Sequence, residues 1–279
     1  MSNNICAGIV LYNPDITQLK RNIAAIIKQV QILYLQDNGS ANISDVEKII
    51  AETSSIVLLR NPKNKGIAWA LNALCKRAES DDFQWILTLD QDSVCPQNMI
   101  ALYKEYLPIA DMLCPKIVDR NYGVLDGNSE NVETVDKCIT SGCLLRLSSW
   151  RKLRGFDEKM FIDGVDFEFC YRMKKSGMNI LRVNDVVLSH EIGNITVRHF
   201  LGFRVIVKNH SPFRKYYIAK NIIYMARKQN NVFVLLKSVM QEIKLLGIVL
   251  LYEDNKSQKV SRIISGIQCG LTEKIAEVD

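Results

Sequence analysis

The stretch WILTLDQD at residues 85–92 joins an apolar run to a pair of carboxylates. The run at residues 85–89 is short and largely apolar, which predicts a buried strand. Asp90 and Asp92 follow at its end, and alternation along extended backbone directs both side chains the same way. Two like charges repel there unless a cation lies beside them, and carboxylate oxygens suit Mg²⁺ or Mn²⁺ bridging to a diphosphate. A solvated turn at the strand end is the alternative interpretation.

The chain before this stretch alternates short strands with helices. Strands are expected at residues 5–11, 31–36 and 55–59, and helices at 16–30, 44–52 and 66–78, with Ser44 capping the second helix. This alternation predicts an α/β fold with a doubly wound, mostly parallel sheet and right-handed crossovers. Ligands of such sheets bind beyond the carboxyl ends of the strands. The sequence places polar turns there, namely Tyr12-Asn13-Pro14, Asp37-Asn38-Gly39-Ser40, Arg60-Asn61-Pro62 and Asp90-Gln91-Asp92.

Two further motifs precede helices. In NPKNKGIAWALNAL, residues 61–74, a turn with Lys63 and Lys65 leads into a helix whose N-terminal amides could bind an anion, or it is a plain surface turn. In MFIDGVDFE, residues 160–168, Asp163 and Asp166 supply carboxylates, together with Glu168, at the mouth of a helix expected at 165–175. Such a carboxylate can serve as a general base or can simply cap the helix.

The charge of the chain is unevenly distributed. The formal net charge is +6, but residues from 198 onward carry 14 basic and 6 acidic side chains, and no acid lies between Glu191 and Glu242. Beyond Pro212 the chain is predicted to be helical. A basic, aromatic segment of this kind suits an anionic partner, which can be nucleic acid, a diphosphate or an acidic lipid surface. The apolar stretch at 232–252 is interrupted by Lys237, Gln241, Glu242 and Lys244, so it is a poor transmembrane candidate and predicts a helix that covers the core or contacts a membrane.

The cysteines and the start of the chain bear on the compartment. The eight cysteines show no paired two-residue spacing, which predicts reduced thiols rather than disulfides or a zinc site. The first residues, MSNNICAGIVLYNP, do not match a secretion signal. We therefore expect a cytoplasmic protein.

The order of the motifs resembles that of family 2 glycosyltransferases with the GT-A fold. The similar blocks are QDNGS, NKGIAWALN, TLDQD, SGCLLR, GFDEKMFIDGVDFEFCYR and SHEIG, and the resemblance covers residues 5–225. Within that family, the residues of these motifs are most similar to those of bacterial rhamnosyltransferases. This similarity rests on the opening residues 10–14, the block FIDGVDFEFCYR, the turn at 190–193, and the late segment at 210–221 with His210, Arg214, Tyr217 and Asn221.

The resemblance implies roles for individual residues. Asp37 would contact the base, Asn64 and Gly66 would border the nucleotide, Asp90 would face the ribose or diphosphate, and Gln91 is included in the nucleotide-sugar site. Asp92, with His190 as a further ligand, would coordinate Mg²⁺ or Mn²⁺. Many relatives carry an adjacent Glu-Asp pair as the base motif, whereas this chain reads Asp163-Gly164. The base would therefore be Asp163 or Asp166, with Asp163 favoured.

The resemblance also implies an activity and partners. A Rossmann-like GT-A domain at residues 1–210 would carry catalysis, and a basic, amphipathic helical extension would follow at 211–279. The implied reaction is a single displacement that inverts the configuration at the anomeric carbon of the sugar. It would move L-rhamnose from dTDP-L-rhamnose, or a sugar from another nucleotide sugar, to a polyprenyl-diphosphate-linked saccharide of O-antigen or capsule. The extension would contact the inner face of the membrane peripherally. No nucleic acid partner is expected, and a homo-oligomer is compatible with the pattern.

Two other classes of function compete with this interpretation. A sugar-nucleotide nucleotidyltransferase should have a Gly-rich basic loop after its first strand, where this chain has Tyr12-Asn13-Pro14-Asp15, and a dinucleotide oxidoreductase should have G-x-G-x-x-G there. A non-catalytic basic module that binds RNA or membrane would use only the late segment. Salt-dependent RNA binding would favour that module.

Overall fold

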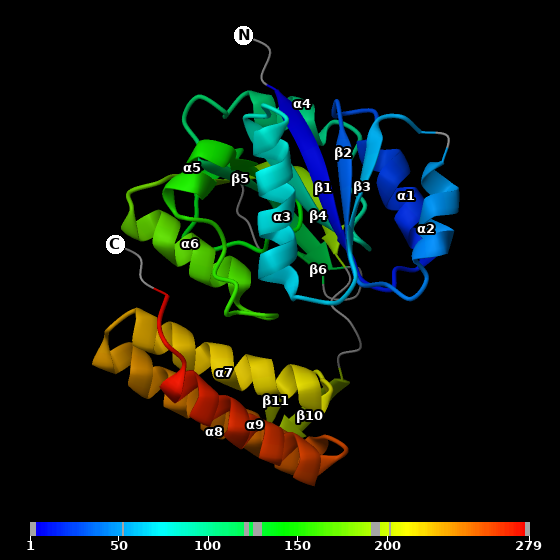
Figure 1. The fold of residues 1–279 in the computed structure, drawn as a ribbon. Coiled ribbons are helices and arrows are strands. Elements are labelled where there is room, and N and C mark those ends of the chain that lie inside the picture. Colours follow the sequence, from blue (N-terminus) through cyan, green and yellow to red (C-terminus); the bar gives the residue numbers. More distant parts are fainter. Residues whose placement is uncertain are drawn as a thin grey trace. The chain divides into compact units, whose positions relative to one another are not determined.

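A computed structural model describes residues 4–51, 53–119, 123–124, 130–190, 196–200 and 202–276 (Figure 1). The chain forms two compact units. The first consists of Met1–Glu158 and Asp166–Glu191, and the second of Lys159–Val165 and Ile192–Asp279. The boundary expected at residue 210 stays a prediction, because a compact unit is not by itself an independent domain.

The first half of unit 1 has the predicted alternation of strands and helices. Its strands are β1 (Ile5–Leu11), β2 (Leu33–Asn38), β3 (Ile56–Asn61) and β4 (Trp85–Asp90), and its helices are α1 (Ile16–Ile26), α2 (Ile43–Ile50) and α3 (Ile67–Ser80). The strands lie in the order β3-β2-β1-β4 and all three pairings are parallel. The carboxyl ends of these strands therefore meet at one edge of the sheet, as the sequence predicts.

The second half of unit 1 continues the sheet with mixed strand directions. It contains α4 (Met99–Lys104), β5 (Met112–Asp119), β6 (Gly123–Val124), β7 (Val132–Thr134), β8 (Cys143–Arg146), α5 (Leu147–Lys152), α6 (Val165–Lys175) and β9 (Ile180–His190). The order continues from β4 as β8-β5-β9-β7, with β6 paired to β5. Strand β8 is antiparallel to both β4 and β5, whereas β9 is parallel to β5. The sheet of the described residues is thus mostly parallel on one side only.

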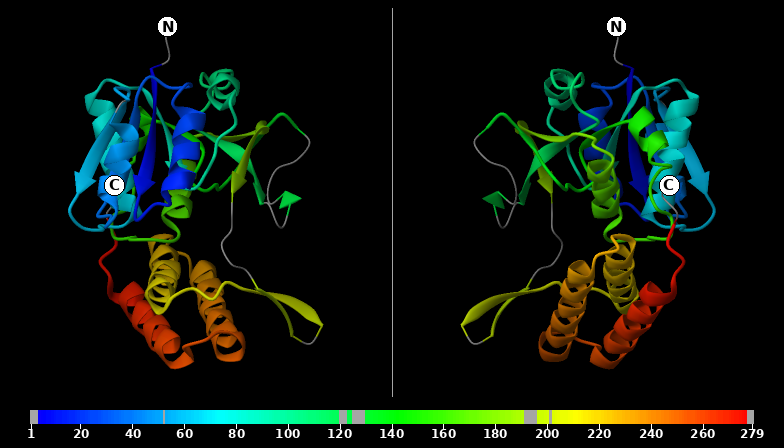
Figure 2. Two further views of the ribbon diagram at one scale, coloured as in Figure 1. Left: turned by 90° about the vertical axis from the view of Figure 1, so that its right-hand side faces the viewer. Right: turned by 90° about the vertical axis from the view of Figure 1, so that its left-hand side faces the viewer.

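Helices cover both faces of the parallel part of the sheet (Figures 1 and 2). Ile9 and Leu11 of β1 belong to the same buried cluster as Leu19 of α1. Gly8 points to the other face, where a Cβ would lie 2.9 Å from a methyl group of Leu74 in α3. Alternating residues of β1 therefore supply an apolar face on which α1 packs. On the other face, Gly8 has no side chain, which lets α3 approach the strand closely.

Two local expectations differ from the structure. Helix α2 begins at Ile43 after Asn42, so the predicted cap at Ser44 is wrong. The Asn42 side chain makes no capping bond and instead donates to the carbonyl of Pro14 at 2.9 Å, which ties the helix start to the loop after β1. Helix α1 ends at Ile26, with Ile27 as its C-cap, earlier than the predicted residue 30.

Unit 2 is helical apart from a hairpin. It contains β10 (Thr196–Phe200), β11 (Phe203–Val207), α7 (Pro212–Lys228), α8 (Val232–Tyr252) and α9 (Lys256–Thr272). Figure 2 shows the three helices side by side. A Cβ at Gly266 of α9 would collide with the carbonyl of Tyr216, and one at Gly270 would lie 2.5 Å from the carbonyl of Lys220. These two glycines therefore allow α9 to approach the backbone of α7. None of the described helices is long and apolar enough to span a bilayer.

All eight cysteines are free, and seven of them are buried. Cys138 lies at the centre of a small thiol cluster, with its Sγ 3.5 Å from Cys143 and 3.8 Å from Cys170. Hydrogen bonds with neighbouring thiols raise the pKa of the Cys138 thiol, and burial raises the pKa of the Cys143 thiol, so both stay protonated at neutral pH. The predicted reduced thiols agree with this arrangement.

Candidate active site

The loop after β2 is built around two buried polar side chains. The carboxylate of Asp37 is only 3% exposed and accepts a hydrogen bond at 3.0 Å from the backbone N–H of Ser40. Gly39 between them has φ 86°, and a Cβ there would lie 2.8 Å from the backbone of Lys63. A glycine is therefore required for this turn to pass beneath the next loop.

Asn38 connects this turn to the start of α3. Its Nδ2 donates to Asn64 Oδ1 at 3.0 Å and to the Gly66 carbonyl at 3.1 Å, and its Oδ1 accepts from the N–H of Lys65 at 3.0 Å. Asn64 Oδ1 also accepts from the N–H of Gly66 at 2.8 Å. Gly66 itself is the N-cap of α3 with φ 90° and provides no side-chain cap. The predicted nucleotide residues Asn64 and Gly66 are thus brought together, and the first amides of α3 receive no side-chain cap.

The Asp90-Gln91-Asp92 turn is held from α1. Asn22, which is fully buried, donates from Nδ2 to the Asp90 carbonyl at 2.7 Å, and Gln18 donates from Nε2 to the Asp92 carbonyl at 3.0 Å. Asp90 is half-buried and Asp92 is exposed. Gln18 and Asn22 are four residues apart on one face of α1, so a single helix fixes both ends of the turn.

Two more side chains complete the support of that turn. Gln91 Oε1 accepts from the N–H of Tyr12 at 2.9 Å, and its Nε2 donates to the Tyr12 carbonyl at 3.4 Å. The amide of Gln91 is therefore occupied in joining the ends of β1 and β4, and its predicted contact with the nucleotide sugar stays a prediction. Ser141 accepts from the N–H of Asp90 at 3.0 Å and donates to the hydroxyl of Ser93 at 2.8 Å.

The end of β9 lies next to the residues that follow this turn. Val94 forms an antiparallel bridge with Ser189, which brings the end of β9 next to the residues that follow Asp92. The side chain of His190 is outside the described part of the chain, so its role as a ligand stays a prediction. Among the described side chains no group of three or more His, Cys, Asp or Glu could hold a metal ion. The two carboxylates at 90 and 92 still fit Mg²⁺ or Mn²⁺, because such ions are usually bound by one or two carboxylates together with substrate phosphates.

Asp163 lies in unit 2 and is clamped by α7. Arg214 donates to both of its carboxylate oxygens, at 2.8 Å from Nη2 to Oδ1 and 2.9 Å from Nε to Oδ2. Asn221 donates from Nδ2 to the carbonyls of Ile162 and Asp163, each at 2.8 Å. Asp163 has φ 66° and Gly164 φ 81°, so a second acid at position 164 would be strained. The hydrogen bond with Asp163 also raises the pKa of Arg214, which stays charged.

The late motif around residue 211 has a structural explanation. Ser211 is the N-cap of α7 and accepts from the N–H of Arg214 at 3.3 Å, with Pro212 at the first helical position. His210 is half-buried near Arg214, and burial is the main cause that lowers its pKa to about 4. His210 is therefore neutral at physiological pH, and the motif fixes the cation that holds Asp163.

The remaining acids of the 160–168 motif lie in α6. Asp166 is half-buried in the first turn, and its Oδ1 accepts from the N–H of Phe167 at 3.0 Å. Glu168 is 1% exposed and forms a two-point ion pair with Arg172 at 2.7 Å, and Arg172 also donates to the carbonyls of Leu153 and Gly155. Glu168 lies in the first turn of α6, as expected, but its carboxylate is buried and paired, so it is not available as a general base.

Several supporting residues are not apparent from the sequence. Asn22, Gln18 and Ser141 contact the Asp90 turn from positions 51 or more residues away along the chain. A pair of polar residues four apart on an amphipathic helix is the only signal that could have drawn attention to Gln18 and Asn22. Arg214 is part of a recognisable motif, but nothing in its spacing identifies Asp163 as its partner.

Comparison with known proteins agrees with this geometry. The family model described as glycosyl transferase family 2 matches residues 6–160, more than half of the chain, and includes the Asp37 and Asp90 turns. The chain belongs to glycosyl transferase family 2. This family 2 glycosyltransferase is 27% identical over 248 residues to the dTDP-rhamnosyl transferase RfbF of Shigella flexneri, and the match covers 82% of each chain.

Solved glycosyltransferases share the fold. S. aureus TarS 1-349 in complex with UDP-GlcNAc has a TM-score of 0.56 at 17% identity, covering 95% of this glycosyltransferase and 81% of TarS. GalNAc-T7 with UDP, GalNAc and Mn²⁺ has a TM-score of 0.58 at 16% identity, covering 77% of this chain but only 47% of GalNAc-T7. At these identities the likeness shows the fold, and the predicted GT-A fold and family are confirmed.

Proposed function

We propose that this glycosyltransferase moves L-rhamnose from dTDP-L-rhamnose, with inversion, to a hydroxyl of a lipid-linked cell-surface saccharide. The observation that carries the proposal is the similarity to a dTDP-rhamnosyl transferase over 82% of both chains. The family match favours this reaction over nucleotidyl transfer and over a non-catalytic basic module.

The edge of the sheet in unit 1 supports nucleotide binding. Asp37 is a buried carboxylate suited to accept hydrogen bonds from a base, and Asn64 and Gly66 lead into the N-terminus of α3. Asp92, with Asp90 two residues before it and with His190, which follows the Ser189 bridge to Val94, would hold Mg²⁺ or Mn²⁺. The ion, when bound, neutralises charge that develops on the departing diphosphate.

The proton of the acceptor hydroxyl needs a base. Asp163 is our first candidate, because Arg214 and Asn221 fix both its carboxylate and its backbone. A positioned carboxylate that accepts this proton as the hydroxyl attacks the anomeric carbon makes a covalent intermediate unnecessary. Asp166 is the second candidate and is tested in the same assays.

Donor binding is the first test. We would measure the melting temperature of the wild type with dTDP-L-rhamnose, UDP-glucose, UDP-galactose and GDP-mannose, with and without Mn²⁺. A native-state ligand raises the melting temperature by mass action. We expect metal-dependent stabilisation by dTDP-L-rhamnose, lost in Asp92→Asn and kept in Asp45→Asn, whose carboxylate lies on the surface beside Lys48. Equal stabilisation of Asp92→Asn would contradict the metal site, and stabilisation by another sugar nucleotide alone would contradict the donor.

The exposed face of α8 supports peripheral contact with an anionic membrane. Its large exposed side chains follow a helical repeat and are Val232, Phe233, Leu236, Val239, Met240, Ile243, Leu250 and Leu251. Lys237 and Lys244 are exposed on the same helix, whereas its one acid, Glu242, is buried. An apolar face whose exposed charged neighbours on the same helix are cations is suited to the interface of an acidic bilayer.

Vesicle flotation tests this contact. We expect the wild type to float with phosphatidylglycerol-containing vesicles and much less with purely phosphatidylcholine vesicles. Leu236→Ser with Met240→Ser should abolish flotation, while Ile109→Ser, a matched exposed site in unit 1, should not change it. Membrane contact would be contradicted if the wild type does not float, or if the double variant floats as well as the wild type and Ile109→Ser do. Neither result would bear on the donor proposal.

A further inference from the structure

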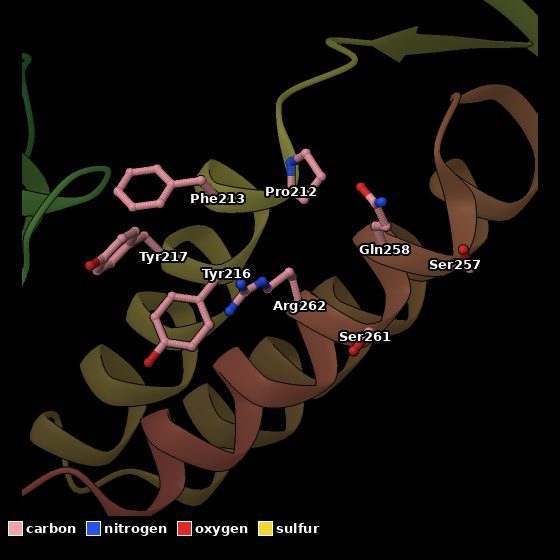
Figure 3. A pocket seen from close by; sticks show the side chains of 8 residues that line it. All are labelled: Pro212, Phe213, Tyr216, Tyr217, Ser257, Gln258, Ser261 and Arg262. Carbon is pink, nitrogen blue, oxygen red and sulfur yellow. The ribbon is translucent and has the colours of Figure 1, made fainter.

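A pocket of about 900 Å³ lies within unit 2, between the start of α7 and the first half of α9 (Figure 3). Figure 3 shows rings on the α7 wall and polar side chains on the α9 wall. The residues used below are Phe213, Tyr216 and Tyr217 from α7 and Gln258, Ser261 and Arg262 from α9. Its volume is that of pockets which bind small organic ligands.

The aromatic wall belongs to a fixed cluster of rings. Phe161 stacks on Tyr217 with centroids 4.9 Å apart, and Phe213 meets both rings edge-on, at 5.8 Å from Phe161 and 5.0 Å from Tyr217. Tyr216 lies edge-on to Tyr217 at 5.0 Å. Despite this packing Phe213 remains 55% exposed. The cluster therefore presents exposed ring surface in a fixed orientation, whereas the rings of an apolar core are buried.

The opposite wall offers hydrogen-bond groups and a charge without an internal partner. Ser257, Gln258, Ser261 and Arg262 are all exposed. Within the described part of the chain, Arg262 forms no ion pair with a carboxylate. Rings on one side and hydroxyl, amide and guanidinium groups on the other match a sugar, whose C–H faces are apolar and whose edges carry hydroxyls.

The pocket is linked directly to the candidate base. Phe161 is two residues before Asp163, and Arg214, which holds the Asp163 carboxylate, comes between Phe213 and the rest of α7. Both connections lie within unit 2. A ligand on the rings would thus rest against the same short segments that fix Asp163.

We propose that this pocket binds the saccharide part of the acceptor, with sugar rings on Phe213 and Tyr216 and with Arg262 on a hydroxyl or an anionic substituent. The inference rests on the proposed function, because it assigns the acceptor to that reaction. It leaves the donor to unit 1, so the two sites are testable separately.

Binding of soluble saccharides tests the pocket. The probes are fluorescein-labelled di- to tetrasaccharides ending in rhamnose, galactose, glucose or N-acetylglucosamine, with and without a terminal phosphate, followed by fluorescence anisotropy. We expect at least one probe to bind the wild type, with affinity reduced about 10-fold or more in Phe213→Ala and in Arg262→Ala. A larger loss in Arg262→Ala for the phosphorylated probes would assign the anionic substituent to Arg262.

Matched controls and a second measurement separate the outcomes. Ile264→Ala and Arg198→Ala remove an exposed apolar side chain and an exposed arginine outside the pocket, and both should bind probes like the wild type. All variants should keep the melting-temperature rise with the nucleotide sugar. The proposal would be overturned if no probe binds, or if binding is unchanged in both pocket variants. It would also be overturned if the pocket variants lose binding of an RNA oligonucleotide and not of a saccharide. A wild type that binds saccharide through the pocket but no nucleotide sugar would support the pocket and contradict the proposed reaction.

Discussion

At the scale of single residues, the clamp on Asp163 links the sequence motif to chemistry. A guanidinium that donates two parallel bonds fixes a carboxylate in orientation as well as in charge, which a lysine cannot do. Arg214 contacts Asp163 and not the reacting atoms, so we regard it as a positioning residue.

Asp163→Asn should lower kcat by about 10²- to 10⁴-fold, because the amide cannot take the acceptor proton. Arg214→Ala should lower kcat by about 10- to 100-fold, and Arg214→Lys should recover part of that loss. Neither change should alter the melting-temperature rise with the nucleotide sugar. Steady-state kinetics with acceptor and thermal shift with donor check both points. Full activity in Asp163→Asn together with its loss in Asp166→Asn would transfer the base to Asp166.

Because Glu168 and Arg172 form a buried ion pair, we expect substitution of Glu168 to lower stability and not to act directly on catalysis. Glu168→Gln leaves the buried guanidinium without its charge partner, and we expect a loss of about 3–5 kcal/mol in the free energy of unfolding. Asp136→Asn disrupts the exposed pair with Lys174 and should cost less than about 1 kcal/mol. Urea unfolding of the two variants decides the matter, and equal losses would contradict the assignment.

At the scale of elements, the packing of α9 on α7 depends on small residues. Gly266→Ala places a methyl group against the Tyr216 carbonyl, so we expect a loss of roughly 1–3 kcal/mol in stability. Gly247→Ala in α8 has nothing within 4 Å of the new methyl group and should gain about 0.5–1 kcal/mol from helix propensity. Thermal unfolding compares them, and a stabilising Gly266→Ala would show that the helices are not in contact as described.

Helix α8 contains a buried acid whose pKa lies near neutral pH. Glu242 is 2% exposed, neither carboxylate oxygen has a hydrogen-bond partner among the described residues, and burial raises its pKa to about 7 from an ordinary 4.5. Folding therefore disfavours the ionised form, so the free energy of unfolding should fall as the pH rises from about 4.5 to about 7.

Glu242→Gln removes this dependence. We expect the variant to be more stable than the wild type at pH 8, by at most about 3 kcal/mol, and to match it near pH 4. Urea unfolding at the two pH values measures the difference. A stability difference that is the same at both values would mean that Glu242 does not titrate across this range.

At the scale of the whole molecule, the sequence predicts the parallel half of the sheet and the polar edge that follows it. Short apolar strands such as residues 85–89 and turns such as Asp37-Asn38-Gly39 carry that information locally. The insertion of β8 between β4 and β5 could not be predicted, because a four-residue strand does not specify its partners.

The candidate site divides in the same way. The acids at 90, 92, 163 and 166 are apparent from their turns, whereas the side chains that orient them lie far along the chain, as Arg214 does from Asp163. The acid Glu168 is also apparent from the motif, but its burial and its ion pair with Arg172 are not, because composition does not reveal burial. Local spacing therefore finds the acids but not their partners.

The measurement that tests the central claim most directly is turnover of dTDP-L-rhamnose with a polyprenyl-diphosphate-linked saccharide acceptor and Mn²⁺. Mass spectrometry would follow the acceptor and chromatography the released dTDP. We predict that the wild type adds one deoxyhexose to the acceptor as dTDP appears, with an inverted anomeric centre by NMR, and that Asp163→Asn with intact donor binding does neither. A product with retained configuration, or transfer of a different sugar in place of rhamnose, would contradict the account.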